Sequence, residues 1–426
     1  MTVRETLRIE SVAAGGAGVA HLPNGAVVFV PRTAPGDVIE AEVITSTQPA
    51  SGRVLRVIEP SADRVDPPCP YVEACGGCDL MHLSATAQER AHTEMVRSAL
   101  SRALPNAKLP EIRVHVAPTQ LAYRTRARFF LKADRRGVRV GYRAPSSHDL
   151  TSIDACLVLD PAIAPLLAEL REVLAGASGD GDAQVARGRD GRPVVSLAWR
   201  GELPASAWSA LDARVTRGAW AGARVVLHGA GQPATFGDPR PVIAGADGAP
   251  LVIAPGGFAQ PSDDGAVLLA RRADELARIE DKPRPRHVVE LFAGSGTLSI
   301  LLAQGAASFT AVEIDEAACA AARENLTARG LAAKVVTADA DAASISPNTT
   351  IVVLDPPRTG ARGAAATIAA SSARVVVYVA CDPPTLARDL TVLTGNGRFA
   401  VTDVEIFELF PQTSHVETVV RLERVR

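Results

Sequence analysis

The sequence predicts an α/β protein whose C-terminal part forms a doubly wound parallel sheet, preceded by a small β-barrel and a central α+β domain. In the C-terminal part, apolar strand-like runs alternate with helical runs, and each strand ends on a polar residue. Residues 1–59 are short apolar runs broken by Gly and Pro. A chain of 426 residues is also too long for one hydrophobic core. We therefore expect domains at residues 1–59, 60–255 and 256–426.

Composition excludes several classes of protein. Charged residues make up 22% and apolar residues 47% of the chain, which is typical of a globular protein. No stretch approaches the roughly 18 uninterrupted apolar residues of a membrane helix, and no secretory signal opens the chain. We expect a cytoplasmic protein that does not contact membranes, with cysteines kept reduced. The net charge of −2 argues against a uniformly basic nucleic-acid-binding surface but is compatible with a local basic patch.

The first 59 residues predict a barrel of about five strands. The runs "LRIESVAAGGAGVAHL", "AVVFVPRTAPGDVIEAEV" and "SGRVLRVIE" alternate or are apolar, with Gly and Pro at the breaks. This segment carries five Arg and six acidic residues, so its charge alone does not indicate RNA binding.

Three cysteines follow in the loop "DPPCPYVEACGGCDLMHL", namely Cys69, Cys75 and Cys78. Clustered cysteines in a reducing compartment favour a metal centre, and Cys156 in "SIDACLVLD" is the best candidate for a fourth ligand. Four thiolates suit an iron–sulfur cluster or a structural zinc, and spacing does not decide between them. His82 is a rival ligand by proximity, and four unliganded thiols are the remaining alternative.

A basic stretch lies between these cysteines. From Arg113 to Arg143 there are nine Arg or Lys and one acidic residue, Asp134. The alternating arginines share one face of a predicted strand, which turns back at "DRRG". Guanidinium groups pair with phosphates, and interleaved aromatic side chains stack on unpaired bases. The hairpin is therefore predicted to bind RNA, and a solvated hairpin face is the alternative. Its arginines and aromatic residues are Arg124, Arg126, Arg128, Tyr123, Phe129, Phe130 and Tyr142.

The C-terminal part contains a predicted nucleotide site. "RHVVELFAGSGTLSILLAQG" reads as a strand, a glycine loop and a helix, with Phe292, Gly294 and Gly296 in the loop. The next strand ends at Glu313, where a carboxylate can accept hydrogen bonds from ribose hydroxyls. Two further strands end on Asp339 and Asp355. A lone G-x-G is a weak signal and also occurs in nicotinamide-binding proteins.

The motif Asp-Pro-Pro at Asp355 helps to decide between a nicotinamide cofactor and S-adenosylmethionine. It resembles the Asp/Asn-Pro-Pro loop of S-adenosylmethionine-dependent methyltransferases that act on bases or amides. In the branch that methylates exocyclic amines an aromatic residue follows this motif, whereas here Arg358 does. The motif favours S-adenosylmethionine, and Arg358 points away from amine methylation.

Cys381 is expected at the carboxyl end of a buried strand, because "VVVYVA" precedes it and Asp-Pro-Pro follows it. C5 of uracil is a weak nucleophile, and a thiolate that adds to C6 generates an enolate that can attack a methyl sulfonium at C5. A base must then remove the C5 proton, and Glu417 in "LFPQTSHVETVV" is the candidate. A packed structural thiol is the alternative for Cys381 and the interpretation for Cys319.

Taken with these motifs, nearly the whole chain resembles the RNA uridine-5 methyltransferases that form 5-methyluridine, in particular the branch with an iron–sulfur cluster and an N-terminal TRAM domain. The resemblance implies an OB-like RNA-binding barrel at the N-terminus and a Rossmann-like S-adenosylmethionine methyltransferase domain at the C-terminus. It implies a [4Fe-4S] cluster, rather than zinc, on the ligands Cys69, Cys75, Cys78 and Cys156. It also implies that residues 83 to about 115 pack on the catalytic domain.

The same resemblance implies roles for site residues. "YVACDPPTLARDL" is similar to the family's nucleophile motif and "FPQTSHVETVV" to its base motif, which implies Cys381 and Glu417. "GGFAQPS" is similar to a Phe-x-Gln-Val-Asn motif, which implies that Gln260 contacts the cofactor. Asp355 would hold the uracil edge and Glu313 the ribose. The sequence departs from the family pattern at three places, which concern the fine tuning of cofactor and base contacts. These are Pro261-Ser262 in place of Val-Asn, Asp382 in place of Asn, and a glycine loop without the common Cys-Gly.

The partner expected from these features is RNA with a uridine flipped out of its stack, bound by a monomer. The TRAM and cluster features favour 23S ribosomal RNA, and the T-loop uridine of transfer RNA is the alternative. Cytosine-5 methylation, amine methylation and a catalytically inactive iron–sulfur RNA-binding protein are further alternatives. The closing "SHVET" motif and the cluster cysteines argue against the first, Arg358 argues against the second, and the joint presence of Cys381 and Glu417 argues against the third.

Overall fold

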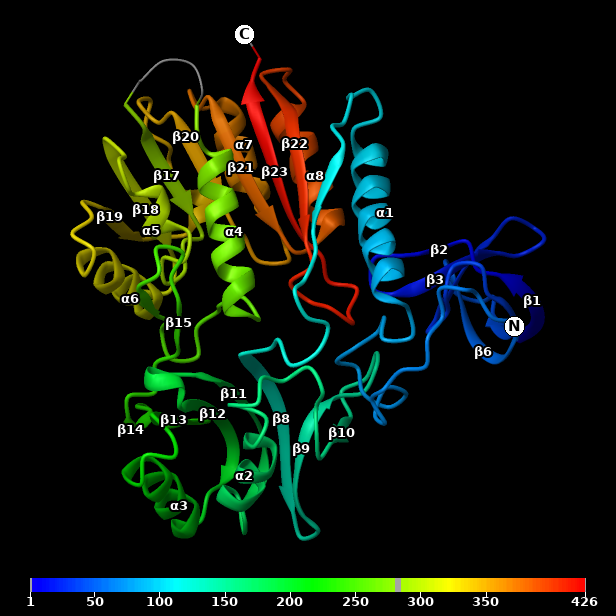
Figure 1. Ribbon diagram of the computed structural model, residues 1–426, viewed down its shortest axis with the longest axis horizontal. Helices are drawn as coiled ribbons and strands as arrows, with labels where there is room; N and C mark the ends of the chain where they lie inside the picture. Colours follow the sequence, from blue (N-terminus) through cyan, green and yellow to red (C-terminus); the bar gives the residue numbers. More distant parts are fainter. Residues whose placement is uncertain (1, 280–284, 426) are drawn as a thin grey trace.

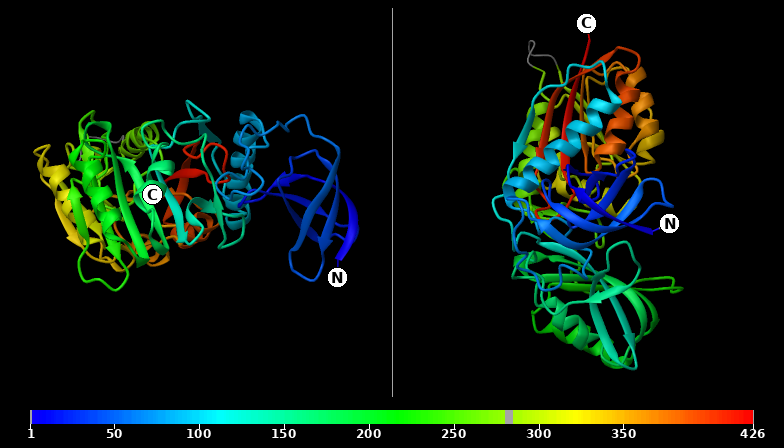
Figure 2. Two further views of the ribbon diagram at one scale, coloured as in Figure 1. Left: turned by 90° about the horizontal axis from the view of Figure 1, so that it is seen from below. Right: turned by 90° about the vertical axis from the view of Figure 1, so that its right-hand side faces the viewer.

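A computed structural model describes residues 2–279 and 285–425, and its strands form four sheets. Figure 1 shows three lobes: the N-terminal strands to one side, a central lobe below, and the C-terminal sheet with its helices above. In Figure 2 the N-terminal lobe projects from the rest of the molecule and contacts it near one end of α1.

The N-terminal lobe is a six-stranded sheet in the order β1-β5-β6-β4-β3-β2, one strand more than the five or so expected. Alternate residues of its strands are buried around Val28, Val30 and Ile39, as expected for a sheet closed over one core. The strands are β1 Thr2–Arg8, β2 Ser11–Val12, β3 Ala17–His21, β4 Val27–Pro31, β5 Val38–Ile44 and β6 Ala50–Glu59.

The central lobe is a seven-stranded sheet in the order β10-β9-β8-β11-β12-β13-β14, covered by two helices. Its core is built on Phe129, Trp199 and Trp220. The elements are β8 Arg126–Asp134, β9 Gly137–Arg143, β10 Leu150–Ser152, α2 Leu166–Val173, β11 Ser178–Arg187, η1 Arg189–Gly191, β12 Pro193–Glu202, α3 Ala205–Thr216, β13 Gly222–Leu227 and β14 Ala234–Gly237.

The C-terminal lobe has an eight-stranded sheet in the order β19-β18-β17-β20-β21-β23-β22-β7, with helices on both faces (Figure 1). Strands β17 to β21 are parallel, and all four residues of β20 are buried, as in a sheet covered on both sides. The predicted doubly wound α/β fold is confirmed. Strand order reverses between β17 and β20, and ligands of such sheets bind at the carboxyl ends beside that point.

The elements of this lobe alternate along the chain as follows: β15 Val242–Ala244, β16 Pro250–Val252, α4 Asp263–Leu276, β17 His287–Leu291, α5 Ser299–Leu302, β18 Ser308–Glu313, α6 Glu316–Thr327, β19 Lys334–Thr337, η2 Ala340–Ala342, β20 Ile351–Leu354, α7 Arg362–Ala370, β21 Val375–Ala380, α8 Pro383–Thr394, β22 Phe399–Phe407 and β23 Glu417–Arg424. The strands β15 and β16 pair only with each other.

Two elements from earlier in the chain join this lobe. Helix α1 (Ala85–Ala103) starts at the cap residue Ser84 and packs on α8. Strand β7 (Ile112–His115) pairs with β22 and extends the sheet. Residues 83–115 therefore lie against the C-terminal sheet in the structure, next to the strand that leads to Glu417.

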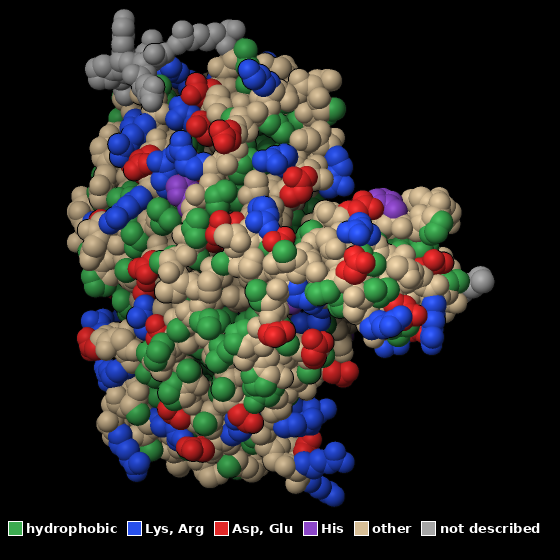
Figure 3. Space-filling view, turned by 45° about the vertical axis from the view of Figure 1, so that its right-hand side comes forward, with side chains coloured by type: hydrophobic (Ala, Val, Ile, Leu, Met, Phe, Trp, Pro, Cys, Tyr) green, Lys and Arg blue, Asp and Glu red, His purple; other side chains and the backbone are tan. Residues whose placement is uncertain are grey.

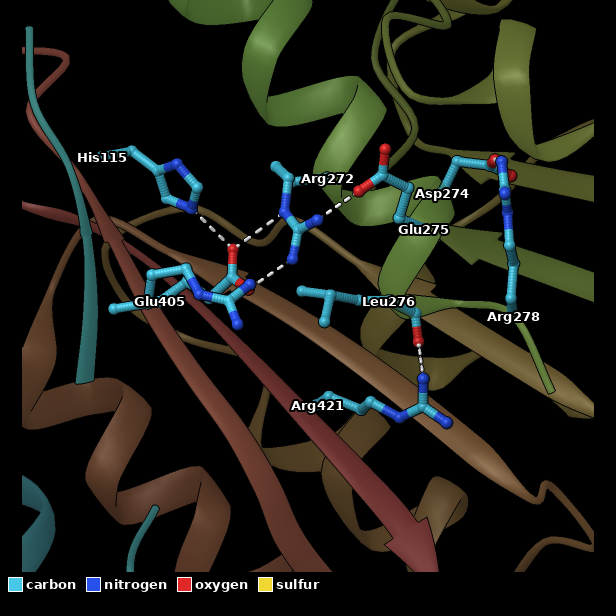
Figure 4. Close-up of polar contacts among 9 residues, drawn as sticks. His115, Arg272, Asp274, Glu275, Leu276, Arg278, Glu405 and Arg421 are labelled. Carbon is cyan, nitrogen blue, oxygen red and sulfur yellow. Dashed lines mark hydrogen bonds and ion pairs between the residues drawn. The ribbon is translucent and has the colours of Figure 1, made fainter. Parts of the chain in front are cut away.

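A buried carboxylate ties β7 and α4 to β22 (Figure 4). Glu405 is 1% exposed and accepts hydrogen bonds from Nε and Nη2 of Arg272, at 3.0 and 2.6 Å. His115 Nε2 lies 2.7 Å from the same carboxylate, and its ring stacks on Phe407. Although burial opposes ionisation, these partners lower the pKa of Glu405 below its usual value. This network holds the β7–β22 edge of the sheet against α4.

The surface carries both signs of charge. On the face shown in Figure 3, Lys and Arg are interspersed with Asp and Glu, and apolar side chains gather over the lower lobe. Within the two described ranges, no helix combines the length and the apolar character needed to cross a bilayer.

Candidate active site and cysteine centre

Three predicted catalytic residues lie where β20, β21 and β23 meet. Cys381 follows Ala380, the last residue of β21, and Ala380 is paired with Thr418 of antiparallel β23. Glu417, the first residue of β23, is therefore next to the end of β21. Asp355 directly follows β20, which is parallel to β21. The sheet register thus brings together residues that are far apart in the sequence.

Burial dominates the electrostatics of this cluster. Burial raises the pKa of Cys381 to about 11, and the carboxylates of Glu417 and Asp355 raise it further. Burial also raises the pKa of Asp355 to about 7. Glu417 is 2% exposed, and burial followed by the charge of Asp355 raises its pKa well above the usual value. Burial thus disfavours the charged form of all three groups.

Arg358 is a further residue of this site, to which the sequence assigned no catalytic role. Its positive charge lowers the pKa of both Cys381 and Glu417, against the effect of burial. Arg358 Nη2 lies 3.0 Å from Nε2 of His415. Burial, then the charge of Arg358, lowers the pKa of His415 to about 4, so the neutral imidazole accepts this hydrogen bond at neutral pH. The position of Arg358 directly after Asp-Pro-Pro was the available signal.

The predicted cofactor loop has the backbone expected for close approach of a ligand. Phe292, Gly294 and Gly296 all have positive φ, at 60°, 54° and 91°. Such a value is costly for Phe292, which is not a glycine, and strain of this kind is concentrated at ligand sites. The carboxylate of Glu313 accepts backbone hydrogen bonds from Gly294 and from Ile314 and Asp315, at 2.8–2.9 Å. Glu313 therefore holds the loop and, with four acceptor sites, retains capacity for ribose hydroxyls.

Gln260, just before α4, has an acceptor atom without a partner. Its side chain is 4% exposed, and its Oε1 has no hydrogen-bond partner. Buried polar atoms are nearly always paired, so this oxygen is available to accept a hydrogen bond from a ligand. Asp339, at the next strand end, accepts a hydrogen bond from the backbone of Asp341. The residues present fit a polar nucleoside ligand.

The four remaining predicted ligands line one small cavity, although they come from two distant loops. Cys69, Cys75, Cys78 and Cys156 surround it together with Tyr142 and Arg124. Burial raises the pKa of Cys78 to about 12 and also raises that of Cys75 and Cys156, while Arg124 opposes the shift at Cys78 and Cys156. As placed in residues 2–279 and 285–425, no three potential metal-ligating side chains converge on a point suited to one metal ion.

His82, the rival ligand, is turned away from this cavity. It is 3% exposed, and its Nε2 lies 3.1 Å from the carbonyl oxygen of Thr33 in the N-terminal lobe. It does not line the cysteine cavity. His82 therefore joins the cysteine loop to the N-terminal sheet.

The three predicted RNA-binding arginines have different surroundings. They line a cavity of about 350 Å³ between the central sheet and Phe258, which is 74% exposed. Arg126 pairs with Asp263 at the start of α4, with 2.6 Å between Nη2 and Oδ1. Arg124 lies 5.9 Å from the ring centroids of Tyr123 and Phe410. Arg128 pairs with Asp182 and is exposed, so it is the most accessible of the three.

Comparisons with known proteins agree with this geometry. Residues 338–425 match the family described as tRNA (Uracil-5-)-methyltransferase, and residues 250–375 match the methyltransferase small domain. The chain is 33% identical to a 23S rRNA (uracil(1939)-C(5))-methyltransferase of Chromohalobacter salexigens, over 98% of this chain and 89% of the relative. It is 32% identical to an uncharacterised RNA methyltransferase of Gloeobacter violaceus, over 98% and 96%.

A solved structure shares the fold across the whole chain. The tRNA (uracil-54, C5)-methyltransferase of Pyrococcus abyssi, solved with S-adenosyl-L-homocysteine, superposes with a TM-score of 0.72 at 23% identity. The match covers 98% of this chain and 99% of that one. The full-length relatives and the C-terminal family match lead to one conclusion: the chain belongs to the RNA uracil-5 methyltransferase family.

Proposed function

We propose that this enzyme transfers a methyl group from S-adenosylmethionine to C5 of a uridine in 23S rRNA, through a covalent bond between Cys381 Sγ and C6. The observation that carries the proposal is the meeting of Cys381, Glu417 and Asp355 beside the cofactor loop. A full-length relative named for this reaction on 23S rRNA supports the choice of substrate.

The reaction needs Cys381 as a thiolate, and the buried site by itself opposes that state. Arg358 is placed to stabilise the negative charge, because its own charge lowers the pKa of Cys381. The thiolate attacks C6, and electrons of the C5–C6 double bond move to C5 and O4. S-adenosylmethionine would supply an electrophilic methyl group, which C5 would accept as the sulfonium S–CH3 bond breaks and S-adenosylhomocysteine is left.

Glu417 is proposed as the base that completes the reaction. After methylation C5 carries both a methyl group and a proton, and removal of the proton restores the double bond as the C6–S bond breaks. The raised pKa of Glu417 makes its carboxylate a strong proton acceptor once it has ionised, and Arg358 favours that ionisation. The two residues thus act on adjacent carbons of one ring.

Asp355 is proposed to hold the edge of the uracil. A carboxyl group with a pKa of about 7 is partly protonated at neutral pH. In the protonated form it can accept a hydrogen bond from N3–H and donate one to O4. That donor would stabilise the negative charge that develops on O4 after thiolate addition.

The cofactor is proposed to lie across the carboxyl ends of β17 and β18. Gln260 would accept a hydrogen bond through its unpaired Oε1, and Glu313 would accept from the ribose hydroxyls. The turn at Phe292, Gly294 and Gly296 would allow close approach of the backbone, and Asp339 would face the adenosine end.

A [4Fe-4S] cluster is proposed for Cys69, Cys75, Cys78 and Cys156. A single zinc ion requires four donors about 2.3 Å from one point, whereas a cubane cluster binds each thiolate at a separate corner. Four thiols from two loops line one cavity, which supplies the ligand set of such a cluster, and the resemblance to the iron–sulfur branch of the family favours it over zinc. Such a cluster would join the two loops covalently.

The RNA is proposed to contact the lobes outside the catalytic domain. We assign residues 1–59 to a TRAM-type RNA-binding barrel, 60–255 to the central cluster domain and 256–426 to the methyltransferase domain. Arg124 and Arg128 and the exposed ring of Phe258 border a cavity with the polarity and the aromatic surface that suit flanking nucleotides. The enzyme would work as a cytoplasmic monomer.

The decisive experiment maps 5-methyluridine in the ribosomal and transfer RNA of a deletion strain. We expect one 23S rRNA site to lose its methyl group and to regain it with the wild-type gene but not with Cys381→Ala. Loss at the T-loop of tRNA would reassign the substrate. Unchanged 5-methyluridine in both RNAs would contradict the proposed reaction and favour a role in RNA binding alone.

A further inference from the structure

The connection between β22 and β23 carries His415 and leads directly into Glu417. We name its residues 410–416 the base loop. In Figure 1 this red connection lies beside the end of α1 nearest the N-terminal lobe. Gln412 in the base loop has a φ of 73°, which is unfavourable for a residue other than glycine and persists only where surroundings impose it. The loop is therefore held in place by its neighbours.

Helix α1 provides part of this restraint. The side-chain amide of Gln88 accepts from the backbone N–H of Gln412 at 2.8 Å and donates to its side chain at 3.1 Å. His92 lies 2.8 Å from Glu408 through Nδ1 and 2.8 Å from the carbonyl oxygen of Thr413 through Nε2. These contacts hold the first half of the base loop.

The second half is held from the cysteine loop. Asp79, which directly follows Cys78, accepts from the backbone N–H of Ser414 through Oδ1 at 2.7 Å and from its hydroxyl through Oδ2 at 2.6 Å. The neighbouring backbone N–H of Leu80 donates to the carbonyl oxygen of Gln412 at 3.0 Å. Ser414 is 7% exposed and directly precedes His415, the partner of Arg358. Both carboxylate oxygens of Asp79 are thus used on one residue of the base loop.

The N-terminal lobe closes the other side of Asp79. A Cβ atom added to Gly16 would lie 2.6 Å from Asp79 Oδ2, far inside van der Waals contact. A side chain at this position would displace the carboxylate. Three parts of the molecule therefore meet at Asp79: the N-terminal sheet, the cysteine loop and the base loop.

We propose that Asp79 is a positioning residue that holds the base loop, and through it His415 and Glu417, in register with Cys381. The inference rests on the proposed role of Glu417 and deepens it. It also gives the cysteine loop a role in the methyl transfer reaction, because any ordering of Cys78 orders the carboxylate next to it. Asp79 itself does not contact the reacting atoms.

The first test compares Asp79→Ala with Asp66→Ala, which removes an exposed carboxylate from the same cysteine loop. Asp79→Ala should lower kcat about 100-fold, the size expected when a reacting group loses its position, with KM for S-adenosylmethionine within about twofold. Because removal of the C5 proton is the impaired step, a protein–RNA adduct should accumulate, as is also expected for Glu417→Gln. Hydrogen exchange of peptides from residues 410–416 should accelerate. Asp66→Ala should change none of these quantities.

A second pair of variants leaves the carboxylate chemically intact. Gly15 and Gly16 both have positive φ, at 95° and 82°, so an alanine at either carries similar backbone strain. Nothing lies within 4 Å of a Cβ at Gly15, whereas one at Gly16 meets Asp79. Gly16→Ala should therefore reproduce the adduct and the faster exchange, and Gly15→Ala should not. This pair decides the question if Asp79→Ala fails to fold or loses its iron.

The outcomes separate this inference from the proposed function. If Glu417→Gln yields no adduct and wild type makes no 5-methyluridine, the proposed function is wrong. If Glu417→Gln yields the adduct while Asp79→Ala and Gly16→Ala turn over like wild type, Asp79 has no positioning role. An equal loss of kcat in Gly15→Ala and Gly16→Ala, without adduct, would also overturn the inference, because it would indicate general destabilisation.

Discussion

The protein has half-buried thiols in two regions that differ in their neighbours. One region holds Cys381, and the other holds the group Cys69, Cys75, Cys78 and Cys156. Burial raises the pKa of Cys381 and of three members of the group. After burial, the pKa of Cys381 responds to the carboxyl groups of Glu417 and Asp355, which can exchange protons, and to the fixed positive charge of Arg358. In the group, the neighbours are one another, with Arg124 and Tyr142. The comparison teaches that the proposed roles of nucleophile and metal ligand rest on the surroundings of each thiol, because the thiol group itself is the same in both places.

The largest expected effect comes from removal of the nucleophile. Cys381→Ala should lower methyl transfer by about 10⁵-fold or more, because the proposed reaction depends on addition of this sulfur to C6. RNA affinity should stay within about twofold of wild type, since covalent addition follows binding. The measurement is transfer of labelled methyl groups to RNA, with filter binding as the control. Residual activity close to wild type would place the protein in the amine-methylating class.

Glu417→Gln should have the second-largest effect. Turnover should fall by about 10²- to 10⁴-fold, because a general base contributes in this range. Methylated RNA should stay bonded to Cys381 and migrate with the protein in denaturing electrophoresis. Cys381→Ala combined with Glu417→Gln is the matched control and should give no such band. An active variant without adduct would remove Glu417 from the mechanism.

Replacement of one cysteine in the other group should act on metal content and stability. Cys78→Ala should abolish iron binding and the brown colour of protein prepared without air, and should lower the free energy of unfolding by about 3 kcal/mol or more, because metal binding is coupled to folding. Cys319→Ala removes a fully buried thiol outside both sites and should leave iron unchanged. Iron content and thermal unfolding are the measurements. A colourless, zinc-loaded wild type would contradict the cluster.

The pH dependence of thiol reactivity tests the electrostatics of Cys381 directly. With its pKa raised to about 11, the thiolate fraction should grow about tenfold per pH unit from pH 7 to 10. Alkylation by iodoacetamide should follow this slope, whereas in unfolded protein it should level off above about pH 9. Because the folded pKa is raised, the associated stability is present below the unfolded pKa and is lost as pH rises towards the folded value. A plateau below pH 8 in the folded protein would show that Arg358 outweighs burial.

The smallest effects are expected at the arginines that line the cavity beside Phe258. Arg128→Ala should weaken RNA binding about threefold and reduce the salt dependence by about one ion, as for loss of one phosphate contact. Arg126→Ala should mainly lower stability, because it leaves Asp263 without one of its partners. Binding isotherms at several salt concentrations separate the two. Equal salt slopes in both variants would contradict this distinction.

Some features of the site depended on short-range sequence alone. Apolar runs that stop at Asp-Pro-Pro place Asp355 and Cys381 at strand ends, since proline cannot continue a strand ladder. Glycines in the loop before α5 permit positive φ, and Glu313 ends the following strand.

Helix α3 was not predicted in the central lobe, because its apolar positions have weak helical periodicity and only Ala207 and Leu211 are buried.

The sequence by itself determined which residues can do chemistry and which of them end strands, because hydrogen-bonding capacity and backbone preference are local properties. Tertiary structure decided which of those residues meet. The antiparallel pairing of β21 with β23 places Glu417 beside Cys381, Asp263 pairs with Arg126, and His82 turns to Thr33 instead of the thiols. Asp79 reaches Ser414 only because two loops pack together. Contacts between distant segments depend on how whole sheets and helices pack, which no local pattern encodes.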